Sequence, residues 1–332
     1  MPVVAVVSYR LGHADGVSVE SAKWIGACRA LGYDVVTVAG SGVADVIHPG
    51  LAYDAADDVG PPSIAELHAA FADAEVVIAE NICSLPLNPR AGRAVADALR
   101  GRRAVLRHHD VPWQRDRFAH WTEPIATDDA WTHVCINALT QHQLAERGIE
   151  ARVVYNHFDV TPTGSASAAR AALNEDGLLA LQPTRAIARK NIPESIRVAK
   201  KLGAVLWLAG PAEEDYGPTL DALLDQRRVP TIRGLPAGVT MGDAYEACDL
   251  VTFPSTWEGF GNPTIESAIH RKPLVAGSYP VLDELRAFGF HWYDYDSIEL
   301  GDATAMDHNY EIAARHFNLR DLPRVLEPIL KD

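Results

Sequence analysis

Cysteine is scarce in this sequence. The 332 residues include four, Cys28, Cys83, Cys135 and Cys248, and no two of them form a C-x-x-C pair. This spacing excludes a small secreted fold held by disulfides and a zinc site built on paired cysteines. Isolated cysteines are typical of proteins in a reducing compartment, so we expect a cytoplasmic protein.

Long apolar runs and positive charge are lacking as well. No stretch approaches the roughly 18 uninterrupted apolar residues that a membrane span needs, and the opening MPVVAVVSYR is too short for the core of a signal peptide. Lysine and arginine number 30 against 44 aspartates and glutamates, which gives a net charge of −14. This balance argues against nucleic-acid binding through the phosphates, whereas contact with a membrane surface stays open.

Short apolar segments are plentiful and alternate with helical patterns from end to end. Continuous runs of valine and isoleucine suit parallel strands that are buried on both faces. The predicted strands are residues 3–7, 35–38, 76–79, 104–106, 133–136, 152–155, 178–182, 204–209, 250–253 and 274–276. Strands that alternate with helices predict an α/β protein built from βαβ units.

A small, polar segment, TPTGSASAAR at residues 161–170, interrupts this alternation and reads as a linker. We therefore predict two Rossmann-like βαβ domains that face each other across a cleft, the first at residues 1–160. Open parallel sheets bind ligands at the carboxyl ends of their strands, so two such edges suggest a site shared by two substrates.

The strongest motif is PSTWEGFGNPTIE, residues 254–266, which follows a predicted strand. Gly259 and Gly261 allow the backbone to turn sharply and to approach a ligand closely. Asn262 suits the N-cap of a helix, and Pro263 suits its first position. The motif therefore offers backbone N–H groups at a helix N-terminus to phosphate or sugar oxygens.

Two carboxylates flank this turn. Glu258 lies in the loop, and Glu266 lies inside the first turns of the helix. One carboxylate could hold a ligand above the helix end, and the other a neighbouring group such as ribose hydroxyls. The alternative is a capped helix whose acidic residues interact with its dipole. That alternative accounts for Glu266, but it leaves the paired glycines and Glu258 unexplained.

A basic segment, QPTRAIARKN at residues 182–191, lies where a predicted strand gives way to a helix. Arg185, Arg189 and Lys190 concentrate positive charge in an acidic chain. The planar fork of arginine and the point charge of lysine together suit a diphosphate. The alternative is a basic patch that only contacts solvent.

The segment LRHHDVPWQRDRF, residues 106–118, follows another predicted strand and combines histidines, an acid and arginines. Histidine beside aspartate could supply a general base or orient a hydroxyl, and arginines could hold an anionic acceptor. The alternative is a surface loop around a partly stacked Trp113. The candidate residues are His108, His109, Asp110, Arg115 and Arg117.

The first loop carries Gly12 and Gly16 between a strand and a helix, so the amides of Val17 and Ser18 could meet a phosphate or a sugar; the alternative is a plain turn. No dinucleotide fingerprint follows the first strand, which disfavours a dehydrogenase. Asp294 and Asp296 fit a solvated loop better than a metal site, so no metal ligands are expected.

The residues Glu258 to Glu266 resemble the E-x₇-E motif of retaining glycosyltransferases of the GT-B fold, family 4. Arg185 and Lys190 resemble that family's R-x₄-K clamp for the diphosphate. VVYNHFD, residues 153–159, is similar to the segment that closes the first domain. NYEIAARHF, residues 309–317, is similar to the final helical region, which implies a donor domain at 161–308 and a C-terminal segment, 309–332, that packs back on the first domain.

The resemblance implies a retaining hexosyltransferase that uses a nucleotide-diphosphate sugar and needs neither metal nor cofactor. The sugar would pass to an acceptor hydroxyl, with the acceptor held by the first domain near His108, Asp110, Arg115 and Arg117. His109 and Glu258 would be the catalytic residues. The donor would be bound by Gly16, Arg185, Lys190, Glu258, Phe260, Gly261, Asn262 and Glu266.

Two alternatives to this function stay open: a nucleotide-sugar epimerase of similar fold, and a nucleotide-sugar-binding protein without turnover. The nature of the acceptor is also open. Further arginines, Arg100, Arg102, Arg103 and Arg107, precede the histidines and suggest an anionic acceptor or an anionic membrane surface. Pairing of these arginines with nearby carboxylates would remove that argument. The oligomeric state cannot be predicted from these residues.

Overall fold

The computed structural model describes residues 1–13 and 15–332 and divides into two compact units. Unit 1 comprises residues 1–157 and 319–332, and unit 2 comprises residues 158–318. The first boundary thus lies a few residues before the one expected at 160. Residues 309–318 belong to unit 2, so only the last part of the expected C-terminal segment lies in unit 1.

Unit 1 is built on a seven-stranded sheet in the order β3-β2-β1-β4-β5-β6-β7, with every neighbouring pair parallel. The strands are β1 (Val3–Ser8), β2 (Asp34–Ala39), β3 (Val46–Ile47), β4 (Ala74–Glu80), β5 (Ala104–His108), β6 (Trp131–Cys135) and β7 (Ala151–Val153). The strand order reverses between β1 and β4, so their carboxyl ends, at Ser8 and Glu80, form a switch point where ligands commonly bind.

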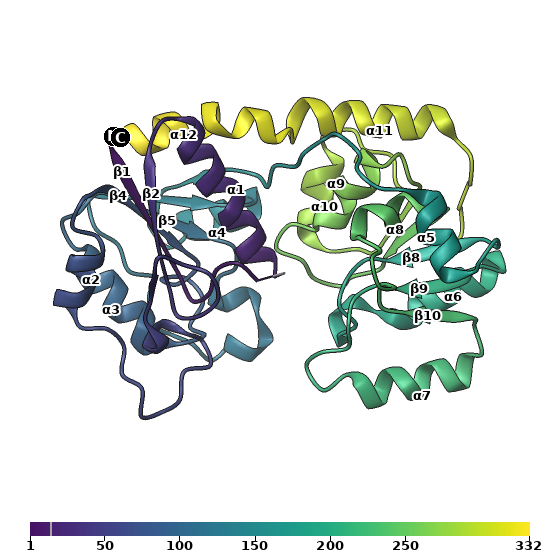
Figure 1. Ribbon diagram of the computed structural model, residues 1–332, viewed down its shortest axis with the longest axis horizontal. Coiled ribbons are helices and arrows are strands. Elements are labelled where there is room, and N and C mark those ends of the chain that lie inside the picture. Colours follow the sequence, from purple (N-terminus) through teal and green to yellow (C-terminus); the bar gives the residue numbers. More distant parts are fainter. Residues whose placement is uncertain (14) are drawn as a thin grey trace. The chain divides into compact units, whose positions relative to one another are not determined.

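Both faces of this sheet are covered by helices, which explains its uninterrupted apolar strands. Along β1, Val4 and Val6 pack with α1 and α12, whereas Ala5 and Val7 pack with α2 and α3 (Figure 1). The helices are α1 (Gly16–Ala30), α2 (Ile64–Ala70), α3 (Pro89–Leu99), α4 (Ala138–Ala145) and α12 (Leu322–Lys331), and the short 3-10 helices are η1 (Pro49–Leu51), η2 (Pro112–Gln114), η3 (Asp116–Phe118) and η5 (Leu319–Asp321).

Unit 2 is built on a five-stranded parallel sheet in the order β10-β9-β8-β11-β12. Its strands are β8 (Leu179–Gln182), β9 (Val205–Leu208), β10 (Thr231–Arg233), β11 (Leu250–Phe253) and β12 (Leu274–Ala276). The order reverses between β8 and β11. The basic segment and the glycine-containing motif directly follow these two strands, so both lie at the switch point of this sheet.

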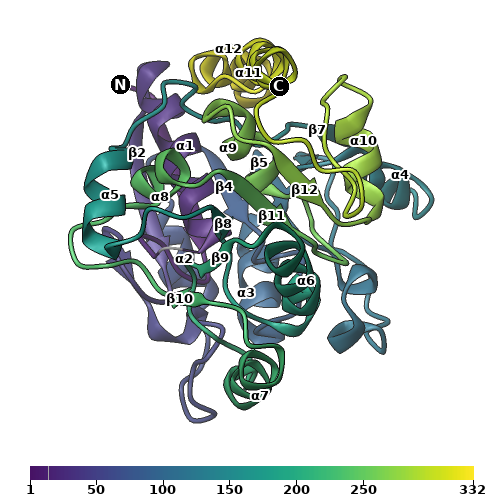
Figure 2. The same ribbon diagram turned by 90° about the vertical axis from the view of Figure 1, so that its right-hand side faces the viewer.

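Figure 2 shows α6 and α7 on one side of the strands of unit 2 and α5, α8 and α9 on the other. The helices are α5 (Ala166–Leu173), α6 (Ile192–Leu202), α7 (Gly217–Arg227), α8 (Met241–Ala247), α9 (Asn262–Ile269), α10 (Pro280–Arg286) and α11 (Ala303–His316), with η4 (Ala188–Lys190) before α6. The prediction of a linker at 161–170 is wrong in its second half, because its alanines begin α5 after the Ser165 cap. The fold class, α/β with two parallel sheets, is confirmed.

Candidate functional site

In unit 2, the segment after β8 places two cations against one buried carboxylate. The Nζ atom of Lys190 donates to Oε1 of Glu258, and the guanidinium of Arg189 lies 2.8 Å from Oε2 of the same side chain. Lys190 is 6% exposed and Glu258 is 8% exposed, so little water reaches these two charges, whereas the side chain of Arg189 is partly exposed. The structure thus brings together Lys190 and Glu258, which the sequence singled out in separate motifs.

Burial and the neighbouring charges together set the pKa values of Lys190 and Glu258. Burial lowers the pKa of Lys190 to about 8, although Glu258 raises it again and Arg189 lowers it further. Burial also acts to raise the pKa of Glu258, but Lys190 and Arg189 together hold it below its ordinary value. At neutral pH two cations therefore face one carboxylate, and the excess positive charge is suited to an anion such as a diphosphate.

Arg185, the other expected member of the clamp, lies at the edge of this cluster. Its guanidinium pairs with Glu213 at 2.6 Å, and its side chain is 40% exposed. Its charge still contributes to the lowered pKa of Lys190, so the two residues are neighbours. Arg189, rather than Arg185, pairs with Glu258 beside Lys190. The positions of the two arginines in the sequence do not reveal which of them makes this contact.

The turn before α9 depends on Gly261. This residue is the N-cap of α9 with φ of 98°, in the left-handed region that glycine tolerates. A Cβ atom there would lie 2.1 Å from the hydroxyl of Tyr279, so no other residue fits without movement. The prediction of Asn262 as the cap is wrong by one position, because Asn262 begins the helix.

Two other expected donor residues have structural partners. Oε2 of Glu266 accepts a hydrogen bond of 2.7 Å from Tyr245, which fixes the carboxylate within the first turns of α9. The ring of Phe260 is 3% exposed and packs between Phe158 and Phe317. Its ring packs inside unit 2, so a donor contact of the kind expected of Phe260 would have to be made by its backbone.

In unit 1, the switch point between β1 and β4 holds a buried ionic network. Nε2 of His109 lies 2.7 Å from Oε2 of Glu80, the last residue of β4, and Arg107 contacts Oε1 of Glu80 at 3.1 Å. Arg107 also lies 3.6 Å from Glu20 of α1 and stacks on Trp24 at 4.2 Å. Sequence reasoning missed Glu80, whose only signal is an acid that ends an apolar strand.

His108 is fully buried, unlike an acceptor-binding residue. Its Nδ1 lies 2.6 Å from the hydroxyl of Ser84, and its Nε2 lies 2.9 Å from Nδ1 of His133. Burial first, and then His133, lower its pKa well below the ordinary value, so the ring is neutral. The structure therefore does not support direct contact of His108 with an acceptor. His109 is also buried, at 5% exposed, but its ring reaches the network at the switch point.

The arginines expected to hold an anionic acceptor are mostly engaged. Arg115 pairs with Asp110 at 2.7 Å, and Arg117 stacks on Phe118 at 5.3 Å. Four others bond within unit 1, to backbone carbonyls or to buried carboxylates: Arg100, Arg102, Arg103 and Arg107. Pairing of this cluster within unit 1 is thus the better interpretation. Arg117 is an exposed member of the cluster without an ion pair in the part of the chain described.

Gly16 is the first residue of α1, but the phosphate site expected beside it is already filled by protein. Asp15 caps the helix and accepts from the amides of Val17 and Ser18 at 3.1 and 3.2 Å. Both amides that were expected to contact a phosphate or a sugar donate to Asp15 instead, so they are not open to a ligand in this structure. A side chain at Gly16 would meet open space, so this glycine is not required by crowding.

Asp294 and Asp296 lie in the segment between α10 and α11. Asp296 pairs with Arg197 and Lys201, as in an ordinary surface loop. Across residues 1–13 and 15–332, no group of three or more histidine, cysteine, aspartate or glutamate side chains is arranged to bind a metal ion. Within the same residues, no helix has the length and apolar character to cross a membrane.

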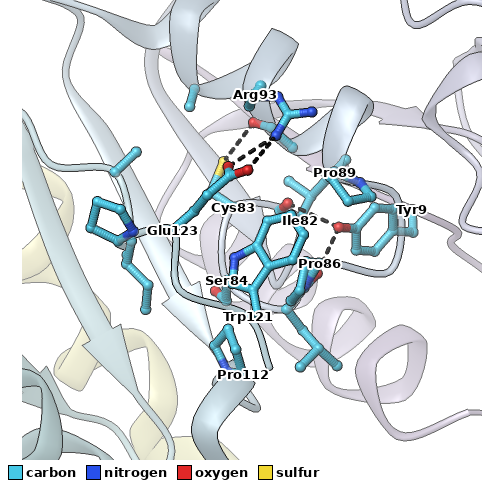
Figure 3. A pocket seen from close by; sticks show the side chains of 16 residues that line it. Tyr9, Ile82, Cys83, Ser84, Pro86, Pro89, Arg93, Pro112, Trp121 and Glu123 are labelled. Carbon is cyan, nitrogen blue, oxygen red and sulfur yellow. Dashed lines mark hydrogen bonds and ion pairs between the residues drawn. The ribbon is translucent and has the colours of Figure 1, made fainter. Parts of the chain in front are cut away.

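In unit 1, a pocket of about 80 Å³ opens beside the switch point between β1 and β4. Figure 3 shows Trp121 among Ser84, Pro86 and Pro112, with Arg93 and Glu123 paired at the edge, 2.9 Å apart. The walls come from the loop after β4, from α3 and from the loop after β5, which carries His109. The pocket therefore lies on segments that leave the carboxyl ends of two neighbouring strands.

Comparison with known proteins identifies the architecture. No family model matches the chain. HepE of Anabaena, solved with UDP and glucose, matches with a TM-score of 0.77 at 17% identity over 100% of both chains. Sucrose-phosphate synthase of Thermosynechococcus elongatus matches with a TM-score of 0.73 at 12% identity, over 100% of this chain and 98% of its own. The fold is that of the GT-B glycosyltransferases.

Sequence relatives point the same way. Mannosylglucosylglycerate synthase of Petrotoga mobilis is 26% identical, over 84% of this chain and 83% of its own length. The enzyme of the same name from Thermotoga maritima is 24% identical, over 97% of this chain and 98% of its own length. This GT-B protein thus resembles sugar-transferring synthases along nearly its whole length.

Proposed function

We propose that this protein is a glycosyltransferase that moves a hexose from a nucleotide-diphosphate sugar to an acceptor hydroxyl, with retention of configuration. The observation that carries the proposal is the buried cluster of Lys190, Arg189 and Glu258, beside the helix N-terminus that Gly261 opens. Developing negative charge on a leaving diphosphate is stabilised by preorganised cations and helix-end amides. The synthase relatives and the GT-B fold support this assignment.

The donor residues have distinct roles in this proposal. Lys190 and Arg185, with Arg189, neutralise the diphosphate, and Glu266 holds the ribose hydroxyls. Glu258 and the backbone of residues 260–262 hold hydroxyls of the donor sugar. Because Lys190 pairs with Glu258 in the structure, part of this ion pair must be replaced by contact of Lys190 with the bound diphosphate. These cations supply the charge that a magnesium ion would otherwise supply, so we propose a metal-independent reaction.

The acceptor we propose is a carbohydrate that carries a carboxylate. The names of the two relatives describe a mannosyl group joined to glucosylglycerate, and glycerate is a carboxylic acid. The acceptor would bind to unit 1, where His109 and the pocket around Trp121 lie at the carboxyl edge of the sheet. Arg117 is an exposed cation near this edge, and Arg93, also exposed, is paired with Glu123 at the edge of the pocket.

The test combines donor binding and transfer. Wild-type protein is screened by thermal shift against nucleotide sugars, where a donor at 100 times its Kd should stabilise by about 2.7 kcal/mol. The best donor is then incubated in EDTA with and without glucosylglycerate and neutral sugars, and the anomer of the product is read by NMR. We expect an acceptor-dependent product with the donor's anomeric configuration.

Lys190→Ala is the informative variant, and Lys201→Ala is its control, because Lys201 is a half-exposed lysine bound to a surface loop. Loss of one charge-assisted contact should weaken nucleoside diphosphate binding by about 1.5–3 kcal/mol in Lys190→Ala only. An unchanged donor shift in Lys190→Ala would refute the assignment. Donor consumption without acceptor would indicate an epimerase, and binding without turnover would indicate a binding protein.

A further inference from the structure

The ionic network in unit 1 is unusual because the two strand-end residues at its centre have no contact with bulk solvent. Glu80 and Arg107 are both 0% exposed, and Glu20 is 1% exposed. Arg107 donates to Oε1 of Glu80 at 3.1 Å and, over a longer distance of 3.4 Å, to Oε2, which also contacts Nε2 of His109 at 2.7 Å. Lys23 contacts the other side of Glu20 at 2.5 Å. Two carboxylates are therefore balanced by two permanent cations before His109 is counted.

The state of Glu80 determines what it can offer to the ring. Burial acts to raise the pKa of Glu80, but Arg107 and His109 together hold it below its ordinary value. An ionised carboxylate has no proton to donate and can only accept. The contact at 2.7 Å therefore requires a proton on Nε2 of His109.

The backbone that carries the His109 ring is held by a neighbouring side chain. Oδ1 of Asn81 accepts from the backbone N–H groups of His109 and Asp110 at 3.0 and 3.2 Å. Asn81 itself adopts φ of 60°, an uncommon conformation for a residue other than glycine. Asn81 thus holds the backbone of His109, and Glu80 contacts Nε2 of its ring. Among the residues that the structure describes, Nδ1 of His109 has no hydrogen-bond partner.

We propose that Glu80 is a positioning residue that holds a proton on Nε2 of His109, so that Nδ1 is left to accept a hydrogen bond from a substrate hydroxyl. The two ring nitrogens of histidine are distinct, and the partner of one decides the role of the other. His109 then selects a ligand that donates, such as a sugar hydroxyl, over an anionic group. The identity of the substrate rests on the proposed function, whereas the tautomer does not.

The tautomer is measured directly on wild-type protein by nitrogen-15 NMR of the histidine rings at about pH 7.5. The signals of His109 are assigned by their absence in His109→Gln. We expect a protonated Nε2 and an unprotonated Nδ1. A proton on Nδ1, or protons on both nitrogens, would overturn the proposal without any variant of Glu80 having to fold.

Glu80→Gln tests the cause, because an amide can donate to Nε2 as well as accept from it, and so releases the tautomer. We expect a mixed or inverted nitrogen-15 pattern and a fall in kcat of at least about tenfold, with a small change in donor KM. Glu20→Gln is the matched control, since it removes a carboxylate from Arg107 without touching His109. It should lower stability while leaving the His109 pattern unchanged.

The outcomes separate the two proposals. The wild-type pattern in Glu80→Gln, or the same change in Glu20→Gln, would show that Glu80 does not set the tautomer. The expected patterns in a protein that transfers no sugar would uphold the positioning role and refute the proposed function.

Discussion

At the scale of single residues, Lys190 is a group of the candidate site whose charge depends strongly on its surroundings. Because burial lowers its pKa to about 8, Lys190 loses its proton within an accessible pH range. A bound diphosphate favours the charged form. Nucleoside diphosphate affinity should therefore be greatest below pH 8 and fall above it, by up to about tenfold per pH unit until the pKa of the complex is reached.

The measurement is titration calorimetry with the nucleoside diphosphate between about pH 7.5 and 9.5, where the phosphates themselves are fully ionised. Lys190→Arg is the control, because a guanidinium stays protonated throughout this range. Its affinity should be weaker at low pH, since the fit is altered, but nearly flat with pH. Parallel pH curves for wild type and Lys190→Arg would show that another group causes the dependence.

Part of the site is predictable from residue types, and part is not. Lys190 and Glu258 stand in short motifs whose chemistry is local, so spacing identifies them. Glu80 carries no such signal, because Arg107 lies on the next strand and His109 directly after it, so both meet Glu80 only when the sheet forms. The adjacent histidines could not be distinguished, because one ring enters the core and the other reaches the network at the switch point.

At the scale of elements, the turn into α9 depends on one glycine conformation and one close contact. Gly261→Ala should destabilise unit 2 by about 1–3 kcal/mol, because the new methyl meets the buried Tyr279 hydroxyl. It should also weaken donor binding, since the amides at the helix end shift. Chemical denaturation and thermal shift with nucleotide sugar measure the two effects.

Gly238→Ala is the matched control for this change. Gly238 also has a positive φ, of 80°, but a Cβ atom there meets nothing within 4 Å, so the variant reports backbone strain alone. Adding Tyr279→Phe to Gly261→Ala should recover part of the loss. Equal destabilisation by the two glycine variants would mean that the contact with Tyr279 is unimportant.

Helix ends show why local patterns predict elements better than their boundaries. Ser18 fits a cap as a residue type, yet Asp15 caps α1 and bonds the Ser18 amide and hydroxyl. Asn262 is displaced as cap because Gly261 can enter the left-handed region. In each case neighbouring residues compete for one role, and the path of the preceding loop decides between them.

At the scale of the whole molecule, alternation of apolar and helical segments predicts two parallel α/β sheets, since strands covered on both faces read as continuous apolar runs. The division into units is harder to predict. The alanines of residues 166–170 look like a linker by composition, yet they form α5 beside α8. The last helix, α12, packs on α1, some three hundred residues earlier, and no local pattern encodes that partner.

This return of the chain makes unit 1 depend on its last helix. Leu322, Leu326, Ile329 and Leu330 form one buried stripe of α12, which packs with Trp24 and Cys28 of α1 and with Val4 and Val6 of β1. Leu326 is 0% exposed, so Leu326→Ala leaves a cavity. The expected loss is about 2–5 kcal/mol in the free energy of unfolding of unit 1.

Hydrogen exchange measured by mass spectrometry locates the effect. Exchange in Leu326→Ala should accelerate in α1, α12 and the strands of unit 1, and change little in peptides of β8 to β12. Leu300→Ala, at a side chain that is 39% exposed in unit 2, should change stability by no more than about 0.5 kcal/mol. Equal acceleration in both units would contradict the division at residues 157 and 319, because the contacts of α12 in this stripe are made to unit 1.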